Sequence, residues 1–348
     1  MTRNVVAITS AALFVVLAAL LALIPAPFVA WNPGQAYNVL AVNDGTPVIR
    51  VSGVQTYPPT GQLFMTTVST TRVDASVSLP EALLAHWVGS SDAMPREVIY
   101  PAGKSVEQVQ REAVVQMDTS QQDATVAALR AAGQPVSEMV QVTSVTASGP
   151  AFDKLKPADL IAKVDGADIK NREQVQAAVR ARKVGDTVNF EVIRGRAVLQ
   201  VPVETASSNT DRSVASVGIG LGIGYRYDAQ IEFGLDRNVV GSSAGLVFAL
   251  GVYDTITVGD LIAERKVAGT GTITPTGQVG RIGGIREKIR GAQDAGATVF
   301  LVPAENCGDL GDIATTMSLV KVTTLKDAIA SLQLLNEANP STEVPRCG

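Results

Sequence analysis

The pattern of hydrophobic positions divides the chain into regions of different character. Residues 5–24 form an uncharged run that is long enough to cross a bilayer as a helix. Residues 105–132 predict a mostly helical segment. Short apolar segments bounded by turn signals predict strands at residues 37–42, 47–51 and 63–68. Further along, residues 140–145 alternate as a strand does, and residues 246–250 form a buried apolar run.

The apolar run near the N-terminus predicts a single-pass membrane anchor. It follows Arg3 and the amino terminus, and positive charge before a span places the N-terminus in the cytoplasm. A cleaved signal peptide is the alternative, because residues 28–30 (FVA) provide a cleavage site. Apolar regions of signal peptides are usually shorter than this run, so an uncleaved anchor is favoured. With either interpretation, the rest of the chain lies outside the cytoplasm.

Residues 136–204 have the element order of a small β-rich domain. The elements are a strand at 140–145, the segment GPAFDKL at 149–155, the segment DLIAKVDG at 159–166, a helix at 172–181 and a strand at 187–194. This order resembles the PDZ domains of bacterial proteases, with Ala158 where that family usually has glycine. A PDZ domain adds an extended peptide to a sheet edge as a strand, and we expect its carboxylate-binding loop just before Val140. The alternative is a module that acts only as a spacer.

A serine precedes the buried run at 246–250. Residues 241–245 (GSSAG) are small, and small residues let the backbone approach a substrate closely. The N-terminus of a helix presents unpaired N–H groups and the positive end of the helix dipole. Such donors can hold the oxyanion that forms when a serine attacks a carbonyl. The simpler interpretation is that Ser242 or Ser243 only caps the helix.

The composition restricts which base could activate such a serine. The single histidine, His86, lies far upstream among apolar residues, and neither Cys307 nor Cys347 has a catalytic histidine nearby. A lysine can act as a base when burial makes it neutral. Lys288 lies on the border of the apolar face of a predicted helix that starts after Gly284. The alternative is a solvated lysine whose stem covers the helix border.

Residues 267–305 (VAGTGTITPTGQVGRIGGIREKIRGAQDAGATVFLVPAE) resemble the proteolytic domain of the Lon serine peptidases. The resemblance extends over roughly residues 215–335. It implies that Ser243 is the nucleophile and that Lys288 is the general base. It also implies that Thr270 corresponds to a threonine whose hydroxyl contacts the lysine.

Two positions depart from the family pattern. The family usually has proline where Ser242 stands, which leaves two candidate serines. The Ala-Gly that follows assigns the nucleophile to Ser243. Many members have an aspartate where Val240 stands, so any help from that aspartate in orienting the lysine must come from elsewhere or be absent.

The fold class expected from these patterns is an α+β multidomain protein. It has an N-terminal transmembrane helix, a PDZ-like β-rich domain and a Lon-type α/β proteolytic domain. The expected boundaries are a transmembrane anchor at 1–30, an N-terminal extracytoplasmic region at 31–135, the PDZ domain at 136–204, a polar linker at 205–214, the proteolytic domain at 215–338 and a C-terminal tail at 339–348.

Other chemistries find little support. The net charge of −4 gives no reason to expect a nucleic-acid partner. We find no Walker-type GxxxxGK[ST] sequence and no cluster with metal-ligand spacing, so no cofactor is expected. Because Lon proteases proper carry an ATPase domain, this chain is expected to be ATP-independent. Ser318 and Lys321 have the SxxK spacing of penicillin-binding proteins, but they open a strand-like run where that chemistry needs a helical turn.

The sequence therefore predicts an ATP-independent serine endopeptidase that uses a Ser–Lys dyad on extracytoplasmic polypeptides. The resemblance also implies assembly into homo-oligomeric rings. The alternative is a membrane-tethered PDZ scaffold with an inactive Lon-like domain, for which Ser242 and Val240 leave room. An enzyme acting on other esters or amides is less favoured beside a PDZ domain. Whether Cys307 and Cys347 form a disulfide, which an oxidising compartment permits, is left open.

Overall fold

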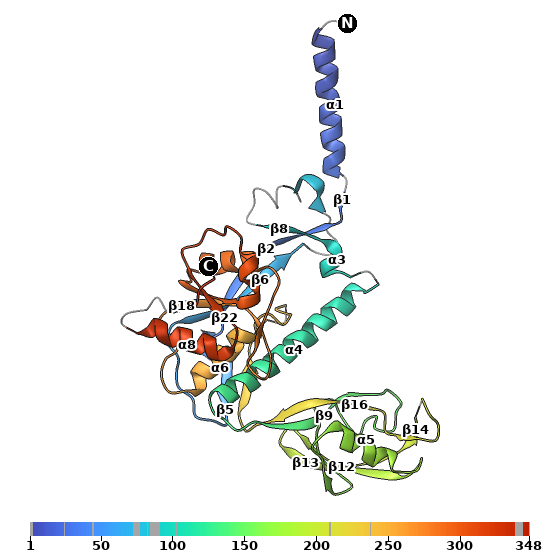
Figure 1. Cartoon of the computed structure of the whole chain (residues 1–348). Helices are drawn as coiled ribbons and strands as arrows, with labels where there is room; N and C mark the ends of the chain where they lie inside the picture. Colours follow the sequence, from blue (N-terminus) through green and yellow to red (C-terminus); the bar gives the residue numbers. More distant parts are fainter. Residues whose placement is uncertain are drawn as a thin grey trace. The chain divides into compact units, whose positions relative to one another are not determined.

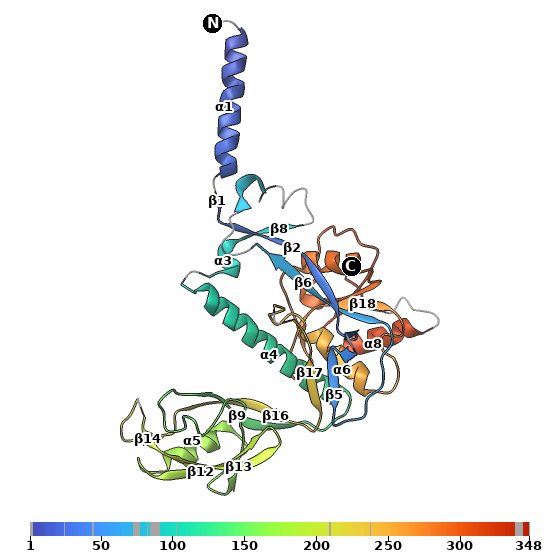
Figure 2. The ribbon, with the colours of Figure 1, turned by 180° about the vertical axis from the view of Figure 1, so that it is seen from behind.

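The computed structural model describes residues 3–23, 25–43, 45–71, 77–81, 83, 91–101, 103–208, 210–236, 238–337 and 344–347. His86 lies outside these residues. The chain divides into two compact units. One combines Met1–Gln134 with Ala229–Gly348 and contains the expected dyad, so it is called the catalytic unit. The other, Pro135–Asp228, contains most of the expected PDZ domain and is called the PDZ unit. Figures 1 and 2 show that each unit contains its own sheet.

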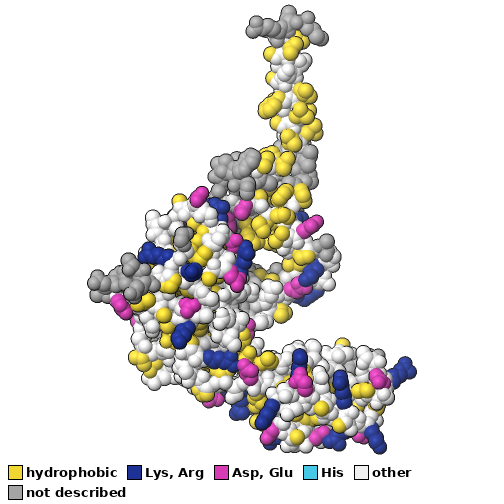
Figure 3. All heavy atoms as spheres, in the orientation of Figure 1, with side chains coloured by type: hydrophobic (Ala, Val, Ile, Leu, Met, Phe, Trp, Pro, Cys, Tyr) yellow, Lys and Arg dark blue, Asp and Glu magenta, His cyan; other side chains and the backbone are white. Residues whose placement is uncertain are grey.

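Helix α1 (Arg3–Leu23) begins the described chain. Its window Asn4–Leu21 is long and apolar enough to cross a membrane, and a signal sequence near an N-terminus has the same properties. Figure 3 shows hydrophobic side chains along its length. The expected apolar helix is thus present, and it is a candidate membrane span.

The catalytic unit is built on a mixed six-stranded sheet with the order β22-β21-β18-β6-β2-β8. Its strands are β2 (Phe28–Asn38), β6 (Gln62–Thr70), β8 (Asp92–Pro95), β18 (Lys266–Gly269), β21 (Val299–Pro303) and β22 (Ser318–Val322). The strands from β6 to β22 are parallel neighbours, whereas β2 is antiparallel to both β6 and β8. Every residue of β21 is buried, as expected for a parallel strand covered on both faces.

Helices α6 (Gly245–Ile256), α7 (Ile285–Asp294) and α8 (Leu325–Asn336) pack against this sheet, and α7 carries the predicted lysine. The long helix α4 (Val106–Ala131) packs against α6. Phe64, Ala268 and Phe300 form one core with the apolar side of α7. On the next residue of β18, Gly269, a Cβ would lie 3.4 Å from the Val247 side chain of α6. Because side chains alternate along a strand, α6 and α7 lie on opposite faces of the sheet.

The smaller elements of the catalytic unit complete this arrangement. They are β1 (Pro25–Ala26), β3 (Val42–Asn43), β4 (Thr46–Pro47), β5 (Ile49–Ser52), β7 (Val77–Ser78), α3 (Arg96–Ile99), β17 (Gln230–Phe233), β19 (Thr272–Ile273), β20 (Val279–Gly280) and the 3-10 helix η1 (Ala304–Asp309). The helix expected at 105–132 forms as α4, with a capping box between Ser105 and Gln108. Such a box satisfies two donors at the start of a helix.

The PDZ unit has a sheet with the order β13-β12-β10-β9-β16, and β11 pairs with β10. The elements are β9 (Ser137–Val145), β10 (Leu160–Val164), β11 (Ala167–Asp168), α5 (Arg172–Arg180), β12 (Thr187–Arg194), β13 (Ala197–Glu204), β14 (Ala206–Ser207), β15 (Ala215–Ser216) and β16 (Ile219–Arg226). Its core is apolar and includes the fully buried Phe190. The element order is the one expected from the sequence.

The limits of the two compact units differ from the domain boundaries that the sequence predicted. Strand β16, which the sequence assigned to the proteolytic domain, pairs with β9 of the PDZ unit over eight positions. Its glycines allow this close pairing, because a Cβ on Gly220 would lie 2.4 Å from the Ser144 hydroxyl. Conversely, β2, β6 and α4 from the region 31–135 belong to the catalytic unit. The PDZ unit is therefore inserted within the catalytic unit.

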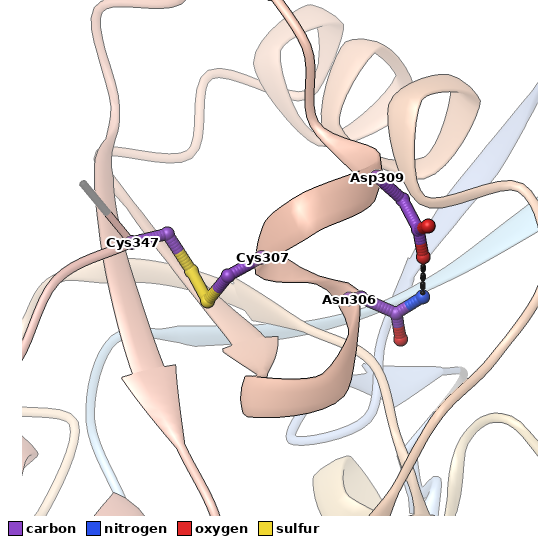
Figure 4. The surroundings of a disulfide bond; sticks show 4 residues. All are labelled: Asn306, Cys307, Asp309 and Cys347. Atoms are coloured by element: carbon purple, nitrogen blue, oxygen red, sulfur yellow. Dashed lines mark hydrogen bonds between the residues drawn. A yellow bond between two sulfur atoms is a disulfide. The ribbon is translucent and has the colours of Figure 1, made fainter.

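The C-terminal tail is tied to the catalytic unit. Cys307 of η1 and Cys347 form a disulfide (Figure 4). The Lys321 N–H donates to the carbonyl oxygen of Pro345, at 2.9 Å, so the tail runs along the outer edge of β22. In η1, Asn306 donates to Asp309 and also exchanges two hydrogen bonds with the backbone of Ile282. The disulfide thus anchors a turn that holds the segment before α7.

Candidate active site

Ser243 lies in the loop that leads into α6. The loop turns at Gly241, whose φ of +98° favours glycine, and the Gly241 N–H donates to the carbonyl oxygen of Ala113 in α4. Ser120 of α4 donates through its hydroxyl to the carbonyl oxygen of Ser242, at 3.1 Å. A Cβ on Gly245 would come within 2.8 Å of the Ile273 side chain. Small residues are therefore required in the loop at residues 241–245 so that α4 and β19 can pack closely against it.

The backbone carbonyl of Ser243 is held by two donors from one segment. The Thr270 hydroxyl donates to it at 3.0 Å, and the Gly271 N–H donates at 2.9 Å. The Gly271 carbonyl in turn accepts from the N–H of Leu246. Thr270 is fully buried, so these bonds are shielded from water. They hold Ser243 against the end of β18.

Lys288 is positioned by the start of α7. Gly284 precedes the helix with a φ of +68°, a conformation that glycine adopts without strain. The Trp31 ring packs on Gly283 and Gly284, and a Cβ on Gly284 would lie 2.7 Å from the Val68 side chain. The glycine pair therefore lets α7 approach β2 and β6 closely. One helical turn later, the Lys288 side chain reaches the serine.

The Lys288 amine lies between two oxygens. Its Nζ is 2.8 Å from Oγ of Ser243 and 2.8 Å from the carbonyl oxygen of Thr66 in β6. Lys288 is only 2% exposed. Burial lowers the pKa of Lys288 to about 7, because removing a cation from water disfavours its charged form. Near neutral pH, much of this lysine is therefore a neutral amine.

The structure brings the expected nucleophile and base together, but it gives the third expected residue, Thr270, a different hydrogen-bond partner. Ser243 and Lys288 are in contact. The Thr270 hydroxyl bonds to the Ser243 carbonyl, whereas the resemblance implied a contact with the lysine. Thr66, which does bond to Lys288, was missed. Its contribution is a backbone carbonyl 222 residues away along the chain, and no side-chain pattern signals such an acceptor.

A cleft of about 720 Å³ opens above Ser243 and Lys288. Its lining includes Trp31, the β6 residues Thr66, Thr67, Val68 and Thr70, and residues 238–241 before Ser243. Helix α4 also contributes, and its Met117 is buried. Among the described residues, no group of three or more His, Cys, Asp or Glu side chains could hold a metal ion.

The PDZ unit has a groove of about 590 Å³ between α5 and the start of β16. It is lined by residues 214–221 and by α5 residues that include Gln176. Gly218, with a φ of +72°, turns the chain before β16. The segment just before Val140, where the carboxylate-binding loop was expected, does not line this groove, and its Ser137 pairs with Arg226 at the far end of β16. The loop before β16 borders the groove instead.

Comparisons with known families give two matches. Residues 238–334 match the Lon protease (S16) C-terminal proteolytic domain, and residues 108–205 match the PDZ domain family. The second match includes most of α4 and ends before β16. Together the two matches cover the PDZ unit's core and the segment from the serine loop to α8.

Bacterial Lon proteases are similar to this chain over short stretches. Lon protease 2 of Herpetosiphon aurantiacus is 45% identical over 73 residues, which is 21% of this chain and 9% of that protein. Lon protease 1 of Bacillus subtilis is 31% identical over 144 residues, or 37% of this chain and 18% of that protein. The chain thus spans less than a fifth of the length of either relative.

Among solved structures, the PDZ domain of the SdrC-like protein from Listeria monocytogenes is 31% identical to this chain. It covers 24% of this chain and 86% of its own, with a TM-score of 0.22. The two family matches indicate that the chain joins a PDZ domain to a domain similar to the Lon protease (S16) C-terminal proteolytic domain.

Proposed function

We propose that this protein is an ATP-independent serine endopeptidase that hydrolyses polypeptides outside the cytoplasm with a Ser243–Lys288 dyad. The observation that carries the proposal is the 2.8 Å separation of Lys288 Nζ and Ser243 Oγ in a buried setting. A lysine with a pKa of about 7 can serve as a base at neutral pH, since catalysis is most efficient when the pKa of the base lies near the working pH.

The Thr66 carbonyl orients the neutral amine of Lys288 toward Ser243. A neutral amine has two N–H donors and one lone pair. When one N–H donates to the Thr66 carbonyl, the lone pair is free to point toward the Ser243 hydroxyl. Lys288 then accepts the hydroxyl proton as Ser243 attacks the scissile carbonyl carbon.

The oxyanion formed in this step needs donors beside the serine. In the described part of the chain, the N–H groups of Ser243 and Ala244 have no hydrogen-bond acceptor. They precede α6, whose positive dipole end favours negative charge. These groups stabilise the tetrahedral intermediate. Lys288 then passes this proton to the leaving amine. A water molecule next gives a proton to Lys288 as it attacks the acyl-enzyme, and Lys288 transfers that proton to Ser243 Oγ when the acid product leaves.

Four features support the wider proposal. No Walker-type sequence is present, which favours ATP independence. The candidate span α1 and the Cys307–Cys347 disulfide favour a catalytic unit outside the cytoplasm, since disulfides persist in oxidising compartments. With the N-terminus inside, the protein is a single-pass membrane protein. The groove between α5 and β16 suits an extended peptide, which a PDZ domain adds as a strand.

The test measures cleavage of a fluorescently labelled unfolded protein by the full-length enzyme in detergent, without ATP. Wild type is compared with Ser243→Ala, Lys288→Met and the matched control Ser242→Ala. We expect wild type and Ser242→Ala to cleave, and the other two to lose activity while keeping their circular dichroism spectra. Activity retained in Ser243→Ala would contradict the assignment. A folded but inert wild type that binds peptides would favour a PDZ scaffold.

Homo-oligomer formation, implied by the Lon resemblance, can be tested by sedimentation of the same samples.

A further inference from the structure

A short segment of chain connects the candidate span to the cleft, and the catalytic unit binds its backbone from residue 25 onward. Helix α1 ends at Leu23, β1 pairs with β7 at residues 25–26, and the Pro27 carbonyl accepts from the Arg96 N–H at 2.9 Å. Strand β2 then starts at Phe28 and pairs with β8 up to Trp31. Figure 1 shows this passage from α1 through β1 into β2. From residue 25 onward, the backbone is therefore held by the catalytic unit itself.

This segment limits how far the active site can stand from the membrane. Trp31, which lines the cleft, is eight residues after Leu23, or at most about 29 Å of extended chain. The Trp31 ring contacts Gly283 and Gly284, and Lys288 is one helical turn, about 6 Å, beyond Gly284. Allowing for the two side chains, the dyad lies at most on the order of 45 Å from the end of α1.

The end of α1 itself marks the membrane surface. A helix of 21 residues is about 31 Å long, which matches a hydrocarbon core of about 30 Å. Little of the helix is left to project as a stalk. The bound of about 45 Å therefore applies to the distance between the dyad and the extracytoplasmic surface of the membrane that α1 spans.

We propose that the substrates of this enzyme are membrane-tethered polypeptides, cut in the segment next to their own membrane anchor. This inference rests on the proposed peptidase activity and on an uncleaved α1. An extended tether of about 14 residues reaches 45 Å, so a site this close to a substrate's anchor can enter the cleft. Confinement to the same membrane raises the effective concentration of such substrates.

The test uses full-length enzyme reconstituted into phosphatidylcholine–phosphatidylglycerol vesicles together with single-span reporters. Each reporter carries the same cleavable segment after a tether of about 15 or about 60 residues. One enzyme variant receives a 20-residue helical spacer of EAAAK repeats before Pro25, which raises the dyad by about 30 Å. The matched control variant receives a flexible Gly-Ser insertion of equal length at the same place. A soluble peptide with the same cleavable segment monitors the activity of every variant.

We expect wild type to cut both reporters. The helical spacer should slow cleavage of the short reporter at least about tenfold, with the long reporter and the soluble peptide cut within about twofold of wild type. The flexible insertion should retain more short-reporter cleavage than the helical one, because it can fold back toward the membrane.

Three results would overturn the inference. The first is a wild type that cuts the soluble peptide but not the short reporter. The second is a helical-spacer variant that cuts the short reporter at the wild-type rate. The third is membrane-derived enzyme whose N-terminal sequence begins after residue 30. In each case the peptidase assignment survives, whereas loss of Ser243-dependent cleavage of the soluble peptide would remove both proposals.

Discussion

The side-chain nitrogen of Lys288 lies 2.8 Å from the hydroxyl oxygen of Ser243, although 45 residues separate them in the chain. The serine precedes α6 on one face of the sheet, and the lysine projects from α7 on the other. They meet beyond the end of β18, whose last residue, Gly269, pairs with Met65 of β6. The next residue of β6, Thr66, offers its carbonyl to the amine. Because β18 ends at Gly269, the side chains of Lys288 and Ser243 can reach each other past the end of this strand.

Activity should rise with pH through the titration of Lys288. Burial lowers its pKa to about 7, and the neutral amine is the active form. The neutral fraction is about one eleventh at pH 6 and about ten elevenths at pH 8, so kcat/KM should rise about tenfold between them. The measurement uses a peptide without titratable groups in that range. A profile that falls over this interval would argue against a lysine base.

Replacing Lys288 with methionine should stabilise the protein at pH 8. The pKa of Lys288 is about 7 in the folded state and about 10.4 in the unfolded state. Between these values the unfolded chain binds more protons, so the lysine lowers stability most at or below pH 7 and the cost fades as pH rises toward 10.4. Allowing for the orphaned Thr66 carbonyl, Lys288→Met should raise the unfolding free energy by about 2 kcal/mol. Urea unfolding at pH 8 and pH 10 checks this, and the gain should shrink at pH 10.

Thr270→Val should reduce turnover without moving the pH profile. The Thr270 hydroxyl bonds to the Ser243 carbonyl, and a buried hydrogen bond contributes about 1 kcal/mol. We expect kcat to fall about fivefold to tenfold, because Ser243 is held less firmly. A Thr270→Ser variant keeps the hydroxyl and should restore most activity. A shift in the apparent pKa of kcat/KM would show instead that Thr270 acts on the lysine.

The disulfide should make a large contribution to stability. Cys307 and Cys347 close a loop with a sequence separation of 40, and constraining a loop of this size stabilises a protein by about 3–4 kcal/mol in the chain-entropy model. Cys347→Ser should lower the unfolding free energy by about this amount, and a reducing agent should do the same to wild type. Urea titration of the two samples provides the comparison. Unchanged wild-type stability under reduction would contradict the prediction.

Peptide binding by the PDZ unit should depend on Leu221. This residue lines the groove beside α5, so Leu221→Asp should weaken binding of extended peptides about tenfold by removing apolar contact. Ile223, two residues further along β16, is 65% exposed and does not line the groove. Ile223→Asp is therefore the matched control and should bind normally. Fluorescence anisotropy with labelled peptides measures both, and equal loss in the two variants would point to a general effect on β16.

The division into a PDZ domain and a Lon-type proteolytic domain could be predicted from the sequence, but the boundaries could not. Residues 205–228 combine a polar stretch with a glycine-rich strand, which is what a linker followed by a new domain also looks like. The choice depends on β16 pairing with β9, a contact between segments about 80 residues apart. Likewise, nothing local in residues 28–70 indicates that β2 and β6 join the catalytic sheet.

By itself, the sequence determined the features that depend on neighbouring residues. Periodicity and composition predicted α1 and α4, and small residues around Ser243 marked a loop before a buried helix. The lysine at the border of an apolar helix face was visible for the same reason. The tertiary structure alone decided that the Thr66 carbonyl holds Lys288, that Thr270 bonds to the serine backbone, and that Cys307 pairs with Cys347. These contacts join residues far apart in the chain, and a backbone carbonyl carries no side-chain signature, so only folding brings such partners together.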